Sequence, residues 1–322
     1  MTAAHGPPDT ASGGKITDSL RKARQSVVLR NRIERRDCKG SITASTVLPK
    51  KDLNRGCIRP DNWNSTLTKL SVNLNKVALV RNTRTRGIPD VAHAGAMVLA
   101  AGADGLTVHP RPDLRHITPA DVRRLGPLCL QHGVEYNIEG NPFAAAGDNY
   151  PGFMALIREM RPAQCTLVPD SPTQATSDHG WTFPDDSQRL APIIADLRAL
   201  GIRTALFMDP LTHMMPYVRD LGCDRIELYT GPYAEAFGTD DQDSVLERYI
   251  LAAQAARDAG LGVNAGHDLD LHNLATLLAA IPVDEVSIGH AFTADALHMG
   301  LTGAVRAYLG VIASVRRQPA QT

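Results

Sequence analysis

Eight short apolar runs follow one another between residues 70 and 290, and nearly every run ends in a side chain capable of acid, base or anion chemistry. Each run has the length of a buried strand, and helical patterns lie between the runs. A (β/α)₈ barrel builds its active site from reactive groups at the carboxyl ends of eight parallel strands, so an enzyme is predicted. The runs are Leu70–Asn75, Gly105–His109, Glu135–Glu139, Gln164–Pro169, Arg203–Asp209, Arg225–Thr230, Gly262–His267 and Glu285–His290.

The junctions between these runs favour a closed barrel over an open sheet. Glycine tolerates the left-handed conformation that closes a helix, and strands alternating with helices indicate a parallel sheet. An open doubly wound sheet normally has a glycine-rich turn after its first strand, whereas residues 74–78 contain no glycine. A barrel is therefore expected. Glycines end the helical patterns before five of the runs, at Gly102, Gly133, Gly201, Gly222 and Gly260.

Two helix starts are predicted from their capping residues. Thr118 offers an N-cap, followed by a proline at the first helical position and by Asp121 in the first turn. Ser244 and Glu247 have the spacing of a capping box, which predicts a helix with its apolar positions on one face.

The charge of the chain is unevenly distributed. Residues 1–66 hold thirteen Lys or Arg against six acids, a balance of +7, although the whole chain is neutral. Such a segment is compatible with a nucleic-acid arm, a partner-binding tail or a targeting peptide, but its low hydrophobicity favours a poorly ordered extension. We expect residues 1–66 to form this extension and residues 67–322 to form the catalytic barrel, with nucleic acid disfavoured as a partner.

The cysteines and the hydropathy indicate a reduced compartment. The five cysteines are widely spaced, without a Cys-x-x-Cys pair, so neither a disulfide framework nor a zinc site is predicted. Cys165 and Cys223 are expected to be small buried hydrophobic residues. No stretch approaches the ~20 apolar residues of a membrane span. A cytoplasmic protein without membrane contact is therefore expected.

Positive charge gathers after the first two predicted strands. Arg81 and Arg84 are able to grip a phosphate, although a solvated surface is the commoner role for such a pair. After the second run, Arg111 and His116 lie close in sequence to His109, with Arg115 between them. This cationic density predicts an anionic ligand.

Carboxylates and histidines end the later runs. Glu135 and Glu139 alternate with Asn137 along one strand face, which is either the barrel interior or the helix layer. An inward Glu139 would be a general acid or base, and a salt bridge with arginine is the alternative. Glu227 has a similar place in the sixth run. The seventh and eighth runs end in Gly-His, where barrels commonly bind phosphate. A metal is disfavoured because no His-x-x-x-His pattern lies on a helix.

Together these segments resemble the pyridoxine 5′-phosphate synthase family of deoxyxylulose-dependent vitamin B6 synthesis. The resemblance runs from about residue 70 to the C-terminus. Its longest motifs are residues 101–109, 226–231 and 263–267, which read AGADGLTVH, IELYTG and VNAGH. Shorter matches are Val72-Asn73, Arg81-Asn82-x-Arg84, Arg111 to Thr118, Asn137-Ile-Glu139, Leu167-Val-Pro169 and Ile288-Gly-His290.

The resemblance implies a (β/α)₈ barrel with extra helices, assembled as a homo-octamer, that uses no metal or other cofactor. It implies condensation of 1-amino-3-hydroxyacetone 3-phosphate with 1-deoxy-D-xylulose 5-phosphate, with release of inorganic phosphate and water. His109 and Glu139 would be general bases, His267 a general acid, and Glu227 a stabiliser of cationic intermediates. The substrates would be held by Asn73, Asn75, Lys76, Arg84, Arg111, His116, Thr176, Asp268, Gly289 and His290.

One motif departs from the commonest family pattern. Asn75-Lys76 stands where most members have Asp-His, although a branch of the family has Asn at the first of these positions. Lys76 still offers a positive charge to a phosphate.

Two other functions remain open from the sequence. One is another barrel lyase or aldolase acting on a phosphorylated sugar, although none of the eight runs has an interior lysine for a Schiff base. The other is a catalytically silent relative that binds a phosphorylated ligand, or a partner through its basic N-terminal segment. Residues 170–180 are the expected lid, because of their length and composition.

Overall fold

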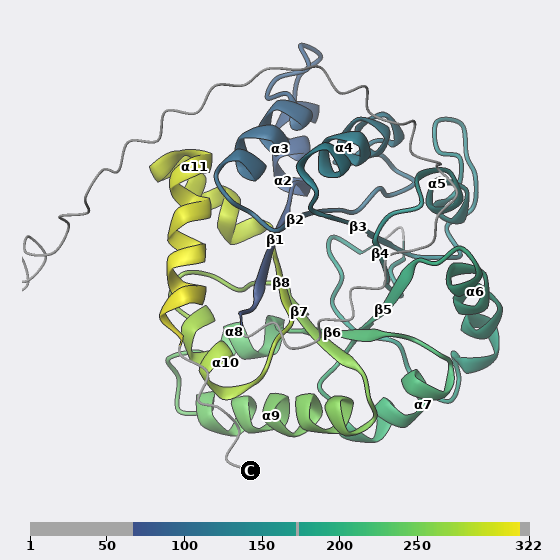
Figure 1. Cartoon of the computed structure of the whole chain (residues 1–322), viewed down its shortest axis with the longest axis vertical. Coiled ribbons are helices and arrows are strands. Elements are labelled where there is room, and N and C mark those ends of the chain that lie inside the picture. Colours follow the sequence, from purple (N-terminus) through teal and green to yellow (C-terminus); the bar gives the residue numbers. More distant parts are fainter. Residues whose placement is uncertain (1–66, 172–173, 316–322) are drawn as a thin grey trace, which may run out of the picture. The chain divides into compact units, whose positions relative to one another are not determined.

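The computed structural model describes residues 67–171 and 174–315, which lie within the unit Cys57–Thr322. Eight parallel strands pair in chain order, and β1 also pairs with β8, so the sheet closes into a barrel (Figure 1). The predicted barrel is confirmed. The strands are β1 (Lys69–Asn73), β2 (Gly105–Val108), β3 (Glu135–Gly140), β4 (Gln164–Leu167), β5 (Arg203–Met208), β6 (Arg225–Tyr229), β7 (Gly262–Gly266) and β8 (Glu285–Ile288).

Seven strands end before the residue at which the sequence pattern placed their ends. His109, Asp209, His267 and His290 follow their strands, and Asn75 begins a helix. Hydrogen bonding between strands stops where the chain turns toward the next helix, so most of the predicted chemical groups lie on the βα loops. The βα loops at the C-terminal face are the usual place for the active site of such a barrel.

Helices surround the ring of strands (Figure 1). The β1–β2 connection contains two helices, and so does the β6–β7 connection, which confirms the expected extra helices. A 3₁₀ helix, η1 (Thr212–Met214), precedes α7. The helices of the described residues are α2 (Asn75–Asn82), α3 (Val91–Ala100), α4 (Pro119–His132), α5 (Phe153–Met160), α6 (Ser187–Ala199), α7 (Met215–Asp220), α8 (Gly231–Ala236), α9 (Gln242–Asp258), α10 (Leu274–Ala280) and α11 (His290–Ser314).

Local signals explain where several helices begin and end. Thr118 and Asp121 form the capping box of α4, and Gly133 closes that helix in the left-handed conformation. All five glycines predicted to close helices have positive φ angles. The predicted capping box at Ser244 is wrong, because α9 begins two residues earlier and Ser244 Oγ donates to the carbonyl of Asp241. The preceding Thr239–Asp241 turn starts the helix before Ser244 is reached.

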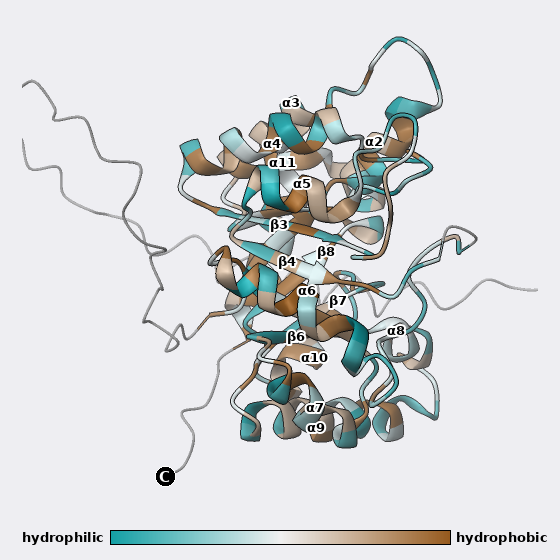
Figure 2. Cartoon of the chain, turned by 90° about the vertical axis from the view of Figure 1, so that its right-hand side faces the viewer, coloured by the Kyte–Doolittle hydropathy of each residue, from teal (hydrophilic) through white to brown (hydrophobic). Residues whose placement is uncertain are grey.

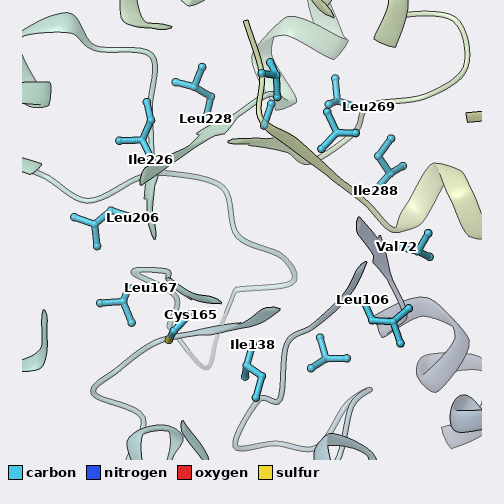
Figure 3. Close-up of a cluster of buried hydrophobic side chains, with 14 of the residues drawn as sticks. Val72, Leu106, Ile138, Cys165, Leu167, Leu206, Ile226, Leu228, Leu269 and Ile288 are labelled. Atoms are coloured by element: carbon cyan, nitrogen blue, oxygen red, sulfur yellow. The ribbon is translucent and has the colours of Figure 1, made fainter. Parts of the chain in front are cut away.

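The hydrophobic core lies between the strands and the helices. Figure 3 shows buried side chains of this layer, including Val72, Leu106, Ile138, Leu206 and Ile226, distributed around the ring of strands. Hydrophobic and hydrophilic positions alternate along helices such as α9 (Figure 2), whose buried residues repeat at helical spacing. Burial of this layer supplies the main driving force for closing the barrel.

The interior of the barrel is polar. Side chains on the opposite strand face form hydrogen bonds to one another, such as Ser71 Oγ to Thr107 Oγ1 at 2.7 Å and Thr166 Oγ1 to Asn137 Oδ1 at 3.2 Å. At the N-terminal end, Glu135 forms an ion pair with Arg203. The face predicted to carry Glu135 and Glu139 therefore points inward, and a buried charge there is matched by a partner.

Helix α11 has the length and apolar composition of a possible membrane span. Its backbone is non-helical at Gly300, with a φ of 74°, so it consists of two helices joined at a kink. It packs against β1, α3 and α10, and Phe292 and Tyr308 are buried there. The helix therefore forms part of the outer layer of the barrel.

Cys165 and Cys223 are buried, as predicted. Cys129, Cys165 and Cys223 are unpaired and buried. Burial raises the pKa of the Cys129 thiol to about 12, so it stays uncharged at neutral pH. The predicted extension, residues 1–66, lies outside the described residues.

Candidate active site

A cavity of about 460 Å³ opens at the C-terminal ends of the strands. Its volume lies within the usual range for small-molecule sites. It brings together thirteen of the fourteen side chains and backbone positions predicted to form the site. These are Asn73, Asn75, Lys76, His109, Arg111, His116, Glu139, Thr176, Glu227, His267, Asp268, Gly289 and His290.

Arg84 is the predicted site residue that does not line this cavity. It is exposed beyond the end of α2, and its Nη1 donates to the neighbouring carbonyl of Thr83 at 2.9 Å. Arg81 is also engaged elsewhere, in an ion pair with Asp121 at the start of α4. Contact between Arg84 and a substrate stays a prediction from the resemblance.

His109 lies between two carboxylates. Its Nε2 is 3.0 Å from Asp170 Oδ2, and its Nδ1 is 3.6 Å from Glu139 Oε1. Burial lowers the pKa of His109, but the two carboxylates outweigh it and raise the pKa to about 9. His109 is therefore an imidazolium at neutral pH in the ligand-free protein. The backbone N–H of His109 donates to Asn75 Oδ1 at 2.9 Å, which fixes the end of β2.

The two catalytic carboxylates predicted from the sequence have different environments. Glu139 Oε1 accepts a hydrogen bond from Asn73 Nδ2 at 2.9 Å, and among the described residues its ion-pair contact is with His109 and not with an arginine. Glu227 is almost completely buried on β6. Burial and the nearby charge of Glu139 raise the pKa of Glu227 to about 8. Glu227 is therefore protonated at neutral pH before any ligand binds.

Two arginines in the loop after β2 form hydrogen bonds with the loop after β4. Arg111 Nη2 donates to Asp170 Oδ2 at 2.6 Å, and Arg111 Nη1 donates to the carbonyl of Gln174 at 3.1 Å. Arg115 Nη1 donates to the same carbonyl at 2.7 Å. The arginines expected to bind an anion therefore contact the segment expected to form the lid.

His116 is a neutral histidine in this cationic cluster. Burial and the positive charges of His109 and Arg111 lower the pKa of His116 to about 3. Its Nδ1 accepts the backbone N–H of Ile117 at 3.0 Å, which leaves the proton on Nε2. The ring therefore offers a hydrogen-bond donor without a charge.

His267 is held in an unusual backbone conformation. Its φ is 85°, and Asp268 follows with a φ of 57°, values that residues other than glycine rarely adopt. Thr230 Oγ1 donates to the carbonyls of Gly266 and His267 and so secures this turn. The ring is held by Asp268 Oδ2 at Nδ1 and by Thr176 Oγ1 at Nε2, both at 2.8 Å. Strain of this kind is common at active sites.

The glycines of the two Gly-His sequences make room for neighbouring side chains. A Cβ at Gly266 would collide with the carboxyl of Glu227, and one at Gly289 would lie 3.0 Å from the Cβ of Asn73. After Gly289, His290 begins α11. The N-terminal end of a helix favours anions, so this strand end suits a phosphate.

Several residues at this end of the barrel were not identified as site residues from the sequence. Ser177, Phe207 and Ser287 line the cavity, and Asp170 contacts two residues that do. Asp170 directly follows the predicted run that ends at Pro169, and this place at a strand end is the signal that could have identified it, whereas the composition of residues 170–180 indicated a lid. Part of that lid segment, Thr176 and Ser177, lines the cavity, whereas residues 172–173 lie outside the described residues.

Among the residues that the structure describes, no group of three or more His, Cys, Asp or Glu is arranged to hold a metal ion. The cavity is lined by four histidines, three carboxylates and the cationic side chains of Lys76, Arg111 and Arg115. Such a set can move protons and bind anions. The fold and the position of the cavity at the C-terminal ends of the strands are those of a (β/α)₈-barrel enzyme.

Comparison with known proteins gives the family. The family model of the pyridoxal phosphate biosynthesis protein PdxJ matches residues 70–314, and the chain belongs to this family. A protein of Xanthomonas campestris pv. campestris (strain B100) named pyridoxine 5′-phosphate synthase is 54% identical over 247 residues, covering 76% of this chain and 96% of that protein. One of the same name from Xylella fastidiosa (strain M23) is 51% identical over 249 residues, covering 77% and 96%.

Solved structures show the same fold at low sequence identity. Tryptophan synthase from Mycobacterium tuberculosis aligns over 79% of this chain and 94% of that chain, with a TM-score of 0.53 and 13% identity. The BexX/CysO complex of Amycolatopsis orientalis aligns over 79% and 93%, with a TM-score of 0.51 and 16% identity. These likenesses concern the barrel alone.

Proposed function

We propose that this enzyme is a pyridoxine 5′-phosphate synthase. It condenses 1-amino-3-hydroxyacetone 3-phosphate with 1-deoxy-D-xylulose 5-phosphate and releases pyridoxine 5′-phosphate, inorganic phosphate and water. The observation that carries the proposal is the gathering of His109, Glu139, Glu227 and His267 in one cavity of a PdxJ-family barrel. Joining an amine to a ketone and forming an aromatic ring requires several proton transfers, for which such a set is suited.

The roles of the four groups follow the family resemblance. Glu139 is one general base, His109 is the other once its imidazolium form has lost a proton, and His267 is the general acid. The contacts of His267 support its role, because Asp268 at Nδ1 and Thr176 at Nε2 hold the ring at the cavity edge. Glu227 stabilises cationic intermediates, since a positive charge beside it would favour its ionised form.

Two regions suit the two phosphate groups. The loop after β2 contributes Arg111 and His116, and the neutral His116 ring adds a donor to the guanidinium charge. At the end of β8, which like β2 is a neighbour of β1, Gly289 and His290 present the start of α11. These two regions support the binding of one phosphate group at each strand end.

The unusual pair Asn75-Lys76 is compatible with the activity. Asn75 accepts from the backbone of His109, a contact that uses only its side-chain oxygen and that an aspartate would also make. Lys76 lines the cavity and adds a positive charge close to His116. We assign Lys76 to the binding of the deoxyxylulose phosphate.

Product analysis tests the function. Both substrates are incubated with the purified full chain, and pyridoxine 5′-phosphate and inorganic phosphate are measured together. Equal amounts of the two products, and none when either substrate is omitted, are expected. A folded chain that binds both substrates without forming product would contradict the proposal and favour a catalytically silent relative.

A homo-octamer and a cytoplasmic location complete the proposal and rest on the family resemblance. Light scattering after gel filtration tests the assembly, with eight chains of 34.7 kDa as the expected mass. A monomer that is fully active would contradict the assembly without contradicting the activity.

A further inference from the structure

Asp170 connects three parts of the site. It follows β4 and is buried. Its Oδ2 atom lies 3.0 Å from His109 Nε2 and 2.6 Å from Arg111 Nη2. Its backbone carbonyl also accepts a hydrogen bond from Asn141 Nδ2 at 2.5 Å, in the loop after β3. A carboxylate held from two sides in this way has little freedom to leave the histidine.

The two nitrogens of His109 have unequal partners. Asp170 lies within hydrogen-bond distance of Nε2, whereas Glu139 is 3.6 Å from Nδ1 and its nearer oxygen already accepts from Asn73. A carboxylate that accepts from one ring nitrogen of a histidine determines which nitrogen keeps its proton. The proton on Nε2 is therefore the better held of the two.

Other charged groups around His109 do not reverse this preference. Arg111 and the neutral His116 lie on its own loop, Glu139 on β3 and Glu227 on β6. Burial raises the pKa of Asp170, but His109 and Arg111 outweigh it and keep that pKa at about 2. Asp170 therefore stays a carboxylate throughout the neutral range.

We propose that Asp170 is a positioning residue that retains the Nε2 proton of His109 and leaves Nδ1, on the Glu139 side, as the nitrogen that exchanges protons in the reaction. The inference rests on the proposed function for its catalytic meaning, but the tautomer itself is a property of the ligand-free protein. Asp170 is also the first residue of the predicted lid, so the same contact joins His109 to the start of that segment.

The test measures the ring nitrogens of His109 by nuclear magnetic resonance in the full chain labelled with ¹⁵N-histidine. The protein has eleven histidines, and the signals of His109 are identified by their loss in His109→Gln. Above its titration midpoint, neutral wild-type His109 is expected to carry its proton on Nε2. A proton on Nδ1 would overturn the inference without any variant of Asp170.

Two variants test the cause. Asp170→Asn removes the charge and is expected to lower the midpoint of His109 by about one pH unit or more. Asp170→Glu keeps the charge and is expected to bring the midpoint back toward wild type. Asp113→Asn is the matched control, because Asp113 pairs with Arg115 in the same region and does not contact His109. An unchanged midpoint in a folded Asp170→Asn protein would overturn the inference.

Kinetics separate this inference from the proposed function. In Asp170→Asn, the limb of the kcat/KM profile that belongs to His109 should move to lower pH, in step with the resonance measurement, and kcat should fall more than KM rises. Wild-type turnover with an unaltered pH profile in Asp170→Asn would contradict the inference alone. Absence of product with the wild-type chain would contradict the proposed function, while the tautomer measurement would still decide the position of the proton.

Discussion

The pKa values of the titratable residues in this site depend on their surroundings more than on the residue type. Two histidines on one loop have opposite shifts, because carboxylates raise the pKa of His109 to about 9 while burial and cations lower that of His116 to about 3. Burial raises the pKa of Glu227. Acid and base forms therefore coexist at one pH, which a reaction with successive proton transfers requires.

Glu227→Gln tests the upward shift through stability. Glu227 stays protonated in the folded protein up to about pH 8, whereas its ordinary pKa is 4.5, so wild-type stability falls as the pH rises between these values. Glutamine cannot ionise and avoids that loss. We expect the variant to melt about 3 °C or more above wild type at pH 8 and close to wild type at pH 5, with turnover reduced.

Thermal unfolding at both pH values measures this effect. An equal change in melting temperature at pH 5 and pH 8 would show that Glu227 titrates normally and would remove the basis for its protonated state.

At the scale of elements, the ends of β6 and β7 determine where His267 and Glu227 lie. β7 passes into His267 through a turn with positive φ angles, and Thr230 at the end of β6 holds the carbonyls of that turn. The neighbouring Gly266 leaves space for Glu227. Two adjacent strands therefore place His267 and Glu227 relative to each other.

Thr230→Val tests the hydrogen bonds from Thr230 to the carbonyls of Gly266 and His267. Valine keeps the shape but removes the hydroxyl, so the buried carbonyl of Gly266 and the partly buried carbonyl of His267 lose that donor. We expect a loss of about 1–3 kcal/mol in the free energy of unfolding and a fall in kcat of tenfold or more, by an order-of-magnitude argument from misplacement of a catalytic group. Thr230→Ser restores the hydroxyl and is the control.

Denaturant unfolding and steady-state kinetics measure these changes. Wild-type kcat in Thr230→Val would mean that the conformation of His267 does not depend on the hydrogen bonds from Thr230.

The sequence predicted the strands and the shared face of Glu135 and Glu139 on β3, because alternation along a strand is a local signal, but it left open whether that face points inward. Partners distant in sequence were not predictable in this way. Asp170 meets His109 across 61 positions, and Thr230 meets His267 across 37, so these pairs depend on the closed barrel. For helix α9 the local signal was misleading, because α9 begins at Gln242 after a turn and not at the predicted cap, Ser244.

At the scale of the whole molecule, the described residues already contain a closed barrel and its cavity. The strands extend from Lys69 to Ile288, and the residues lining the cavity lie between Asn73 and His290. All eight strands of the described barrel begin at or after Lys69. We therefore expect that the basic N-terminal segment takes no part in the proposed chemistry.

Removal of residues 1–66 tests that separation. A chain that starts at residue 67 is expected to keep kcat and KM within about twofold of the full chain, because no catalytic or substrate-binding prediction falls in the segment. Steady-state kinetics of both chains at equal concentration measure the effect. Loss of turnover from a folded shortened chain would assign the segment a part in the site or in assembly.

The central claim is that the cavity at the C-terminal end of the barrel performs the condensation. The most direct test is the rate of pyridoxine 5′-phosphate formation by wild type, Glu139→Gln and Glu247→Gln under identical conditions. Glu247 is exposed on α9, so the same chemical change is made outside the site. We expect product from wild type and from Glu247→Gln, and a loss of at least about a hundredfold for Glu139→Gln. Equal rates for wild type and Glu139→Gln would contradict the assignment of this cavity as the active site.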